Sequence, residues 1–239
     1  QNTTINKSKK KESYEHNVML VPFEPKLYNS EIDYHINKET NLSGKEIKFQ
    51  FRDGLNEQIY KAFKKKKIGV IDLLEDTVKY RKEMYSIYSN LSYEYMKVPD
   101  QKNYKAPKKE KKQNGIEKGQ LNVETNSDER FMNAKVTNAK LVPLLYGKHK
   151  TDVFVFINQL DIKAGTLTPD LNGYGPSDRK IIVHYTVYSY DAKELNSGIS
   201  ETNFPQSLNV PSKISTKYFS LVAEQIADRV YNALYPPKK

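Results

Sequence analysis

The four histidines, His16, His35, His149 and His184, are the side chains best suited to acid–base chemistry or metal binding in this chain. They are scattered along the sequence. No pair has the His-x-x-x-His spacing that brings two imidazoles to one face of a helix. We expect His184 to lie on the outer face of a strand as an exposed or half-buried side chain. The histidines therefore predict no catalytic residue and no metal ligand.

Other motifs that carry chemistry are weak. The sequence has no cysteine, which excludes disulfides, thiolate zinc sites and cysteine nucleophiles. It has no Walker motif and no G-x-S-x-G elbow, and "NGYGPSD" at 172–178 indicates a hairpin loop. "DLLED" at 72–76 gathers three carboxylates that could bind a cation, but it lacks the alternating spacing of a calcium loop and indicates a solvated strand end. We therefore predict no cofactor and no enzyme activity, with a hydrolase of unrecognised site as the enzymatic alternative.

A tyrosine-rich stretch, "YRKEMYSIYSNLSYEYM" at 80–96, has the apolar spacing of an amphipathic helix that packs on a sheet. Tyr85 and Tyr93 fall outside that apolar stripe. Tyrosine suits protein interfaces because it combines a large apolar ring with a polar tip. We predict that Tyr85 and Tyr93 contact a partner.

The net charge of +10 is concentrated in residues 1–16, the run Lys64–Lys67 and residues 97–120. Lysines at the end of a helix offset the negative end of its dipole, which is a structural role. Arginine, which forms the bidentate contacts typical of nucleic-acid recognition, is rare in this chain. The lysines assigned to partner binding are Lys64, Lys65, Lys66, Lys67, Lys108 and Lys109. The alternative ligand is an anionic polymer (nucleic acid, lipopolysaccharide or a wall polymer), for which affinity would fall steeply with salt.

Hydrophobic periodicity predicts strands at 17–23, 68–74, 134–137, 152–162, 180–191 and 199–204, and helices at 43–67, 80–96, 138–147 and 212–234. The opening strand, in "HNVMLVPFEP", is apolar on both faces, as a central strand covered twice must be. Pro22 and Pro25 then end its pairing before a polar loop at 24–43. Alternation within the strand at 152–162 places on one face Phe154, Phe156, Leu160 and Ile162.

This order of elements predicts an α/β protein of the mixed α+β kind, with a single mixed β-sheet and helices packed on it. Residues 1–16 are predicted to form a disordered basic tail. Residues 17–239 are predicted to form one domain, interrupted at 75–130 by a long basic insertion that is first helical and then Lys-rich and flexible.

The start of the chain and its composition bear on its compartment. The first residue is Gln1 rather than Met, and we expect that a signal peptide is removed before it. No apolar run approaches the roughly 18 residues that a membrane span needs. The abundance of Lys, Asn and Tyr indicates an AT-rich genome. We expect an exported protein of the periplasm or cell envelope without a transmembrane segment.

Three stretches resemble a group of bacterial envelope domains: "VMLVPF" at 18–23, "GKHKTDVFVF" at 147–156 and "VYSYDAKELNSG" at 187–198. The group comprises the N-terminal domain of TolB-like proteins, the lipoprotein activators of penicillin-binding proteins and the periplasmic domain of the curli secretion channel. In these domains a helix and a strand follow the opening strand, and an amphipathic helix closes the fold.

Within this resemblance, Asp191 and Gly198 match an Asp and a later Gly that the group carries after its penultimate strand. The match covers residues 17–74 and 131–235, whereas 75–130 is longer and more basic. The resemblance implies a binding or assembly domain without catalytic residues. We therefore expect a non-catalytic accessory or assembly protein of a bacterial cell envelope, which binds envelope proteins or a second copy of itself.

Overall fold

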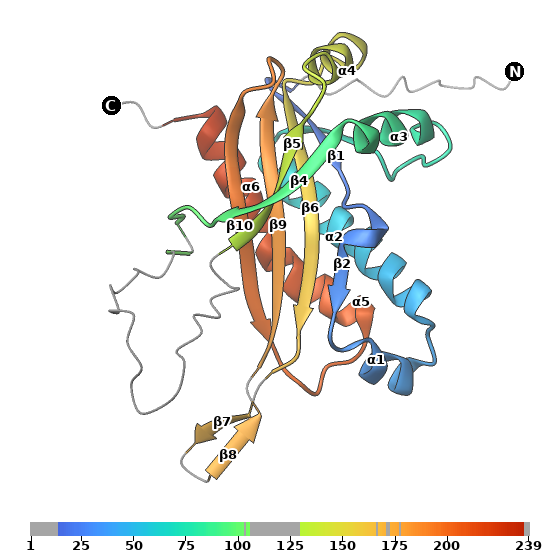
Figure 1. Cartoon of the computed structure of the whole chain (residues 1–239), viewed down its shortest axis with the longest axis vertical. Coiled ribbons are helices and arrows are strands. Elements are labelled where there is room, and N and C mark those ends of the chain that lie inside the picture. The colour runs from blue at the N-terminus through green and yellow to red at the C-terminus, as the bar shows by residue number, and fades with distance from the viewer. Residues whose placement is uncertain are drawn as a thin grey trace, which may run out of the picture.

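The computed structural model describes residues 14–102, 104–105, 130–165, 167–170, 173–176 and 178–236. Its centre is a mixed β-sheet in the order β10-β9-β6-β1-β3, with β2 also paired to β6 (Figure 1). Its strands are β1 (Asn17–Val21), β2 (Tyr28–Ser30), β3 (Gly69–Asp72), β6 (Val153–Lys163), β9 (Arg179–Ser189) and β10 (Glu194–Phe204). β1 is parallel to β3 and β6, whereas β9 is antiparallel to β6 and β10. The predicted α/β class with a mixed sheet is confirmed. Residues 1–13 of the predicted tail lie outside the described residues.

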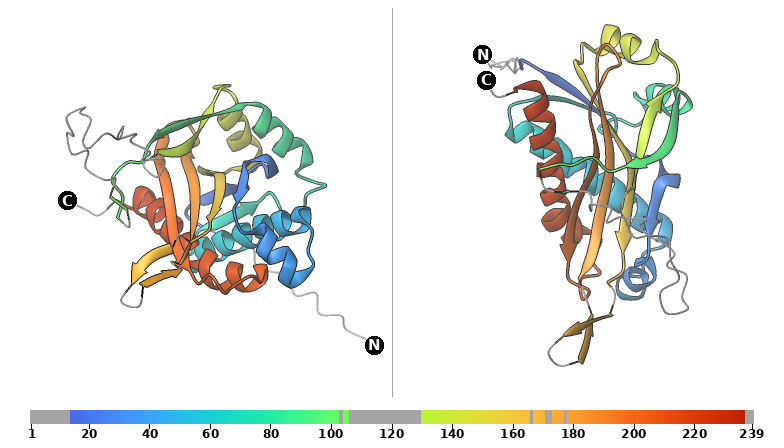
Figure 2. Two further views of the ribbon diagram at one scale, coloured as in Figure 1. Left: turned by 60° about the horizontal axis from the view of Figure 1, so that its bottom comes forward. Right: turned by 60° about the vertical axis from the view of Figure 1, so that its left-hand side comes forward.

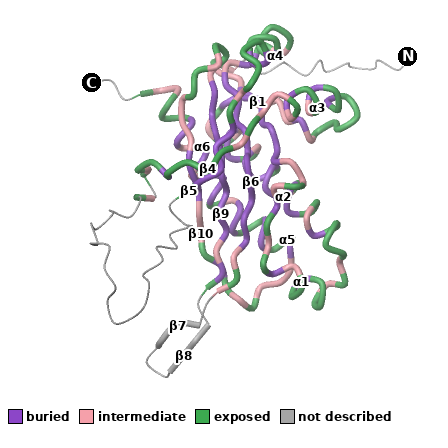
Figure 3. The backbone as a smooth tube through the Cα atoms, in the orientation of Figure 1, coloured by how far each residue is buried: buried purple, intermediate pink, exposed green. Residues whose placement is uncertain are grey.

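Both faces of the sheet are covered (Figure 2). Helices α2 (Gly44–Lys65) and α6 (Ser220–Leu234) lie on one face, and α3 (Arg81–Ser89), α4 (Leu141–His149) and the ribbon of β4 (Leu91–Lys97) and β5 (Arg130–Val136) lie on the other. The remaining α-helices and strands are α1 (Asp33–Thr40), α5 (Pro211–Ile214), β7 (Leu167–Asp170) and β8 (Gly173–Pro176). The strands are buried along most of their length (Figure 3) because alternate side chains enter two cores. Val18 and Leu20 face α2 and α6, and Met19 and Val21 face α3 and α4.

The predicted helix at 43–67 forms as α2. Ser43 caps it: its Oγ accepts the Glu46 N–H at 3.3 Å, and the Glu46 carboxylate accepts the Ser43 N–H at 2.7 Å. The predicted apolar stripe is fully buried against the sheet and consists of Ile47, Phe51, Leu55, Ile59 and Phe63. Across the described part of the chain, no helix has both the length and the apolar character needed to cross a membrane.

β1 and β2 lie end to end along the same edge of β6. Residues 18–21 pair with the first half of β6, and residues 28–30 pair with its second half. Pro22 and Pro25 fall between the two strands, where Pro22 has no N–H to donate. The prolines therefore interrupt the pairing of one edge instead of ending it. The predicted loop at 24–43 is wrong, because the chain returns to β6 as β2 and then forms α1.

The interruption leaves backbone carbonyls that two helices satisfy. Tyr88 Oη on α3 donates to the carbonyl oxygen of Pro22 at 2.7 Å, and Arg52 Nε on α2 donates to that of Phe23 at 2.8 Å. Arg52 Nη2 also donates to Tyr88 Oη at 3.1 Å. Arg52 and Tyr88, the carbonyl clamp, therefore join helices on opposite faces of the sheet through the strand break.

The ribbon β4–β5 crosses over the sheet, and β5 pairs with β4 along one edge only. The peptide groups on its other edge bond to side chains of the sheet. The Met132 N–H donates to His184 Nδ1 at 2.9 Å, and the Met132 carbonyl accepts from Asn158 Nδ2 at 2.8 Å. His184 is only 3% exposed, so its predicted exposed or half-buried place is wrong. The reason is that β5 covers the outer face of β9.

Ala134, the next residue of β5 whose peptide group points to β9, is bound in the same way. The Ala134 N–H donates to Thr186 Oγ1 at 3.1 Å, and its carbonyl accepts from Tyr188 Oη at 3.0 Å. Thr186 Oγ1 also accepts from Asn158 Nδ2 at 2.7 Å and donates to Asn133 Oδ1 at 2.5 Å. Alternate side chains of β9 thus replace a neighbouring strand. Because every backbone group must be satisfied on burial, they fix where β5 lies.

A bulge in β6 at Asn158 changes which side chains face each core. The pairing of β6 with β9 shifts register between Ile157 and Gln159. After the shift, Leu160 and Ile162 face α2 and α6, on the opposite side from the two phenylalanines of the strand. Their predicted place beside those phenylalanines is wrong because a bulge adds one residue to the alternation.

The predicted helix at 80–96 is correct only for its first half, since α3 ends at Ser89 and residues 91–97 form β4. β4 pairs with β5 in register from Leu91–Val136 to Lys97–Arg130. Pairing with a partner distant in sequence overrides the helical spacing. Most of the predicted Lys-rich insertion lies outside the described residues.

Thr186→Val tests whether the side chains of β9 hold β5. Valine keeps the shape but removes the hydroxyl, so the buried Ala134 N–H loses its partner. We expect the free energy of unfolding to fall by about 2–3 kcal/mol, measured by urea denaturation. Thr137→Val, at an exposed threonine, is the matched control and should change it by less than about 0.5 kcal/mol. Equal effects of the two changes would contradict this role for Thr186.

Candidate functional site

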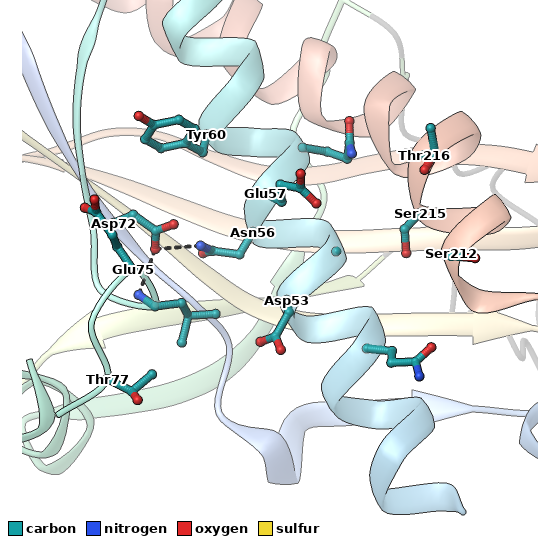
Figure 4. A pocket seen from close by; sticks show the side chains of 14 residues that line it. Asp53, Asn56, Glu57, Tyr60, Asp72, Glu75, Thr77, Ser212, Ser215 and Thr216 are labelled. Carbon is teal, nitrogen blue, oxygen red and sulfur yellow. Dashed lines mark hydrogen bonds between the residues drawn. The ribbon is translucent and has the colours of Figure 1, made fainter. Parts of the chain in front are cut away.

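A cavity of about 790 Å³ lies between α2, the segment after β3 and α5 (Figure 4). It adjoins the carboxyl end of β3, and ligands tend to bind at this end of parallel strands. Its size is typical of a small-ligand site. Its acidic lining residues are Asp53, Glu57, Asp72 and Glu75, and none of the described lining residues is Lys or Arg. We call this cavity the acidic pocket.

One wall of the acidic pocket is a polar stripe on α2. Asp53, Asn56, Glu57 and Tyr60 are three or four residues apart, so they share one side of the helix. The apolar stripe of α2 is buried against the sheet, which leaves this side directed to the pocket (Figure 4). The amphipathic packing of α2 therefore positions the wall.

Asp72 connects the end of β3 to that wall. Its Oδ1 accepts from Asn56 Nδ2 at 2.6 Å and from the Leu74 N–H at 2.8 Å (Figure 4). The second bond is a local turn of the kind that aspartate favours, and it bends the chain after the strand. The turn brings Glu75 and Thr77 to the rim of the acidic pocket.

The third wall is formed by α5 and the π-helical turn that follows it (Ser215–Phe219). Ser215 lies opposite Gly54 of α2, and a Cβ at Gly54 would be 2.5 Å from Ser215 Oγ. Only glycine allows the two helices to approach so closely at this point. π-Helical turns inside longer helices occur frequently at functional sites.

Two buried oxygen atoms in these walls, Asn56 Oδ1 and Ser215 Oγ, have no hydrogen-bond partner within the described chain. Asn56 is 3% exposed and Ser215 is 6% exposed. Leaving a buried polar atom unpaired costs about 1–3 kcal/mol. A ligand that donates hydrogen bonds to these atoms would offset that cost, so both atoms favour a donor-rich ligand.

The electrostatics of the acidic pocket favour a positively charged ligand. Partial desolvation raises the pKa of Asp53, the charge of Asp72 raises it further, and the charge of Arg52 opposes both. No group of three or more His, Asp or Glu side chains is placed to hold a metal ion, among the residues that the structure describes. An ammonium or guanidinium group would supply both the positive charge and several N–H donors. The geometry therefore fits an organic cation.

A second recess, of about 390 Å³, contains Asp161 and His184. His184 Nδ1 accepts the Met132 N–H, and its Nε2 lies 3.3 Å from Asp161 Oδ2, so the tautomer with hydrogen on Nε2 fits both contacts. Burial alone would raise the pKa of Asp161, but hydrogen bonds from His184, Asn29 and Gln159 hold it below its ordinary value. Nδ1 therefore holds the ribbon through Met132, and Nε2 connects β9 to Asp161 on β6.

The lysines predicted to bind a partner are partly engaged within the chain. Lys65 Nζ lies 2.8 Å from Glu224 Oε1, and Lys66 Nζ lies 2.5 Å from Asp228 Oδ1, both on α6. These ion pairs connect the end of α2 to α6 and reduce the positive potential there. The other predicted lysines are Lys64 and Lys67 at the same helix end, and Lys108 and Lys109, which lie outside the described residues.

The two predicted interface tyrosines have different surroundings. Tyr85 on α3 is 77% exposed, and its contact with a partner stays a prediction. Tyr93 on β4 is half-buried. Burial raises the pKa of Tyr93, and the nearby Glu24 carboxylate raises it further. The structure does not bring either tyrosine to the acidic pocket.

Sequence reasoning found part of the acidic pocket. The carboxylates of "DLLED" are a possible cation site by their chemistry, and two of them, Asp72 and Glu75, line the pocket, where a solvated strand end is predicted. It missed Asp53 and Asn56, because polar residues at this spacing are ordinary on the exposed side of any helix. It missed Ser215 because only the tertiary fold brings α5 beside α2.

No protein-family model matches the chain, and no curated protein matches its sequence.

Asp53→Asn tests the electrostatics of the acidic pocket. A carboxyl group whose pKa is raised by folding destabilises the folded state at any pH where it is ionised. The variant should therefore have a higher free energy of unfolding than the wild type at pH 7. The difference should vanish as the pH falls through the carboxyl range, where Asp53 becomes protonated.

Chemical denaturation at several pH values measures this difference. Glu31→Gln is the control, because Glu31 lies 3.2 Å from Lys163 and has a cationic partner. A lower stability of Asp53→Asn at pH 7 would contradict a destabilising effect of the ionised Asp53 carboxylate.

Proposed function

We propose that this protein is a non-catalytic accessory or assembly protein of a bacterial cell envelope, which acts by binding other proteins. Its acidic pocket receives a lysine or arginine side chain of the partner. The pocket carries the proposal because it combines four carboxylates with two unpaired buried oxygen atoms and no basic residue among the described lining. Such a lining suits a donor-rich cation.

The uneven distribution of charge makes this pocket selective. The segments that hold the net charge of +10, residues 1–16, Lys64–Lys67 and 97–120, repel cationic peptides. A basic peptide is attracted where the local potential is reversed, and the carboxylates of the acidic pocket reverse it. Electrostatic attraction of this kind contributes mainly to specificity and to the rate of association.

A binding role also agrees with the use of the polar side chains. Both ring nitrogens of His184 form hydrogen bonds within the fold, Nδ1 with the Met132 N–H and Nε2 with Asp161. The alternative ligand, an anionic polymer, gains less support from the lysines, because Lys65 and Lys66 pair with carboxylates of α6. Protein binding is therefore the better-supported function.

The envelope location rests on the sequence resemblance to envelope domains. The resemblance implies an opening strand, a helix and a second strand, and a closing amphipathic helix. The corresponding elements are β1, α2, β3 and α6, in that order along the chain. This agreement supports the proposed location without identifying a partner.

Asp53→Asn combined with Glu75→Gln tests the proposed role of the acidic pocket. The probe is a fluorescently labelled peptide of alternating Lys and Gly, and its affinity is measured by fluorescence anisotropy. Removing two carboxylates should weaken binding about tenfold, since each charge pair contributes up to about 1 kcal/mol. The wild type should bind a Ser-Gly peptide of equal length much more weakly.

The matched control combines Glu31→Gln with Glu94→Gln, which removes the same charge from surface positions outside the pocket. It should leave the affinity nearly unchanged. Equal losses in the two double variants, or equal binding of the lysine and serine peptides, would refute the role of the pocket. A further comparison uses both double variants as baits in extracts of the envelope, where only the pocket variant should lose its bound proteins.

A further inference from the structure

Helix α4 has an unusual surface for an exposed helix, because its sequence, LVPLLYGKH, is apolar on most sides. Leu141, Val142 and Leu145 pack into the core beside the sheet. Leu144 and Tyr146 remain 68% and 37% exposed. A helix that is apolar all round is normally buried, so this exposed side needs a partner.

A third exposed apolar side chain lies beside this helix. Tyr190, in the turn between β9 and β10, is 51% exposed, and its ring centroid is 5.0 Å from that of Tyr146. Leu144, Tyr146 and Tyr190 form what we call the apolar tip. Figure 1 shows α4 at one end of the molecule, beyond the end of the sheet. An element at one end can enter a flat surface without hindrance from the rest of the fold.

Basic side chains surround the apolar tip. Lys150 Nζ lies 5.8 Å from the ring centroid of Tyr146, and Lys140 and Lys193 are exposed at the ends of α4 and of the turn. The turn also carries the carboxylate of Asp191, to which Ser189 donates a hydrogen bond. Lysines around exposed Leu and Tyr side chains are typical of proteins that bind anionic lipid surfaces.

Both ends of the described chain meet at the same end of the molecule. His16 Nδ1 lies 3.1 Å from Asp152, which closely follows α4, and the ring of Tyr235 lies 5.2 Å from that of His16. The sequence beyond these ends contains six lysines and one glutamate, within residues 1–13 and 237–239.

We propose that the apolar tip docks on the surface of a membrane that contains anionic lipids, with Leu144, Tyr146 and Tyr190 entering the headgroup region. The surrounding lysines contact lipid phosphates. Tyrosine suits this position because its ring is apolar and its hydroxyl remains hydrated. The inference does not depend on the acidic pocket or on its ligand.

Vesicle co-sedimentation of the full chain tests the proposal. Vesicles that contain phosphatidylglycerol should bind the protein, and vesicles of phosphatidylcholine alone should bind it much more weakly. Leu144→Ser combined with Tyr190→Ser should lower the partition coefficient at least tenfold, because two large apolar side chains no longer enter the lipid. Lys150→Gln should lower it about fivefold, and added salt should weaken binding of the wild type.

The matched control is Tyr34→Ser combined with Leu221→Ser, at two exposed apolar residues on α1 and α6. It should bind vesicles as the wild type does, and thermal unfolding should show that all variants are folded. Three results would overturn the proposal: no binding to anionic vesicles, the same loss in the control, or a dimer that dissociates in the tip variant while vesicle binding is unchanged. The last result would show that the apolar tip forms the interface between two copies of this protein.

Discussion

The structure depends on how the edge of β6 is shared between β1 and β2. Two strands can pair along one edge only if the chain leaves the sheet and returns, and the carbonyl groups exposed at the break need donors. Tyr88 and Arg52 supply these donors from α3 and α2. Asp53 follows Arg52 directly on α2, so the contact that closes the break also sets the rotation of the helix. The acidic pocket is therefore positioned by a backbone requirement of the sheet.

The opposite face of the sheet follows the same principle. In the described structure β5 pairs with a strand along its β4 edge only, so His184, Thr186 and Tyr188 of β9 bind the peptide groups of its other edge. A buried polar network of this kind favours one arrangement because any displacement leaves several groups unpaired. The His184–Asp161 pair has a structural role here, since it connects the ribbon at Met132 to β9, β6 and, through Asn29, to β2.

The sequence predicted those features that depend on local pattern. The predicted helix at 43–67 forms as α2, and the apolar character of the opening strand on both faces indicated a sheet covered on both faces. It failed where distant parts of the chain determine structure. The end of the helix at Ser89 depends on pairing with β5, and the bulge at Asn158 depends on contacts with Met132 and Thr186. Only the carboxylates of "DLLED" in the acidic pocket could be predicted from the sequence, because the tertiary fold alone brings α5 beside α2.

The two proposed binding regions differ in the way their side chains are stabilised. Around α4, Glu83 has a cationic neighbour in Lys148, which lowers its pKa even though burial opposes the shift. In the acidic pocket the pKa of Asp53 is raised instead, so the fold retains a charge that it does not stabilise. Ionisable groups with a perturbed pKa cluster at functional sites. α4 and α5 lie toward opposite ends of the molecule (Figure 1), so a protein held at a membrane by α4 would still present its acidic pocket to a partner.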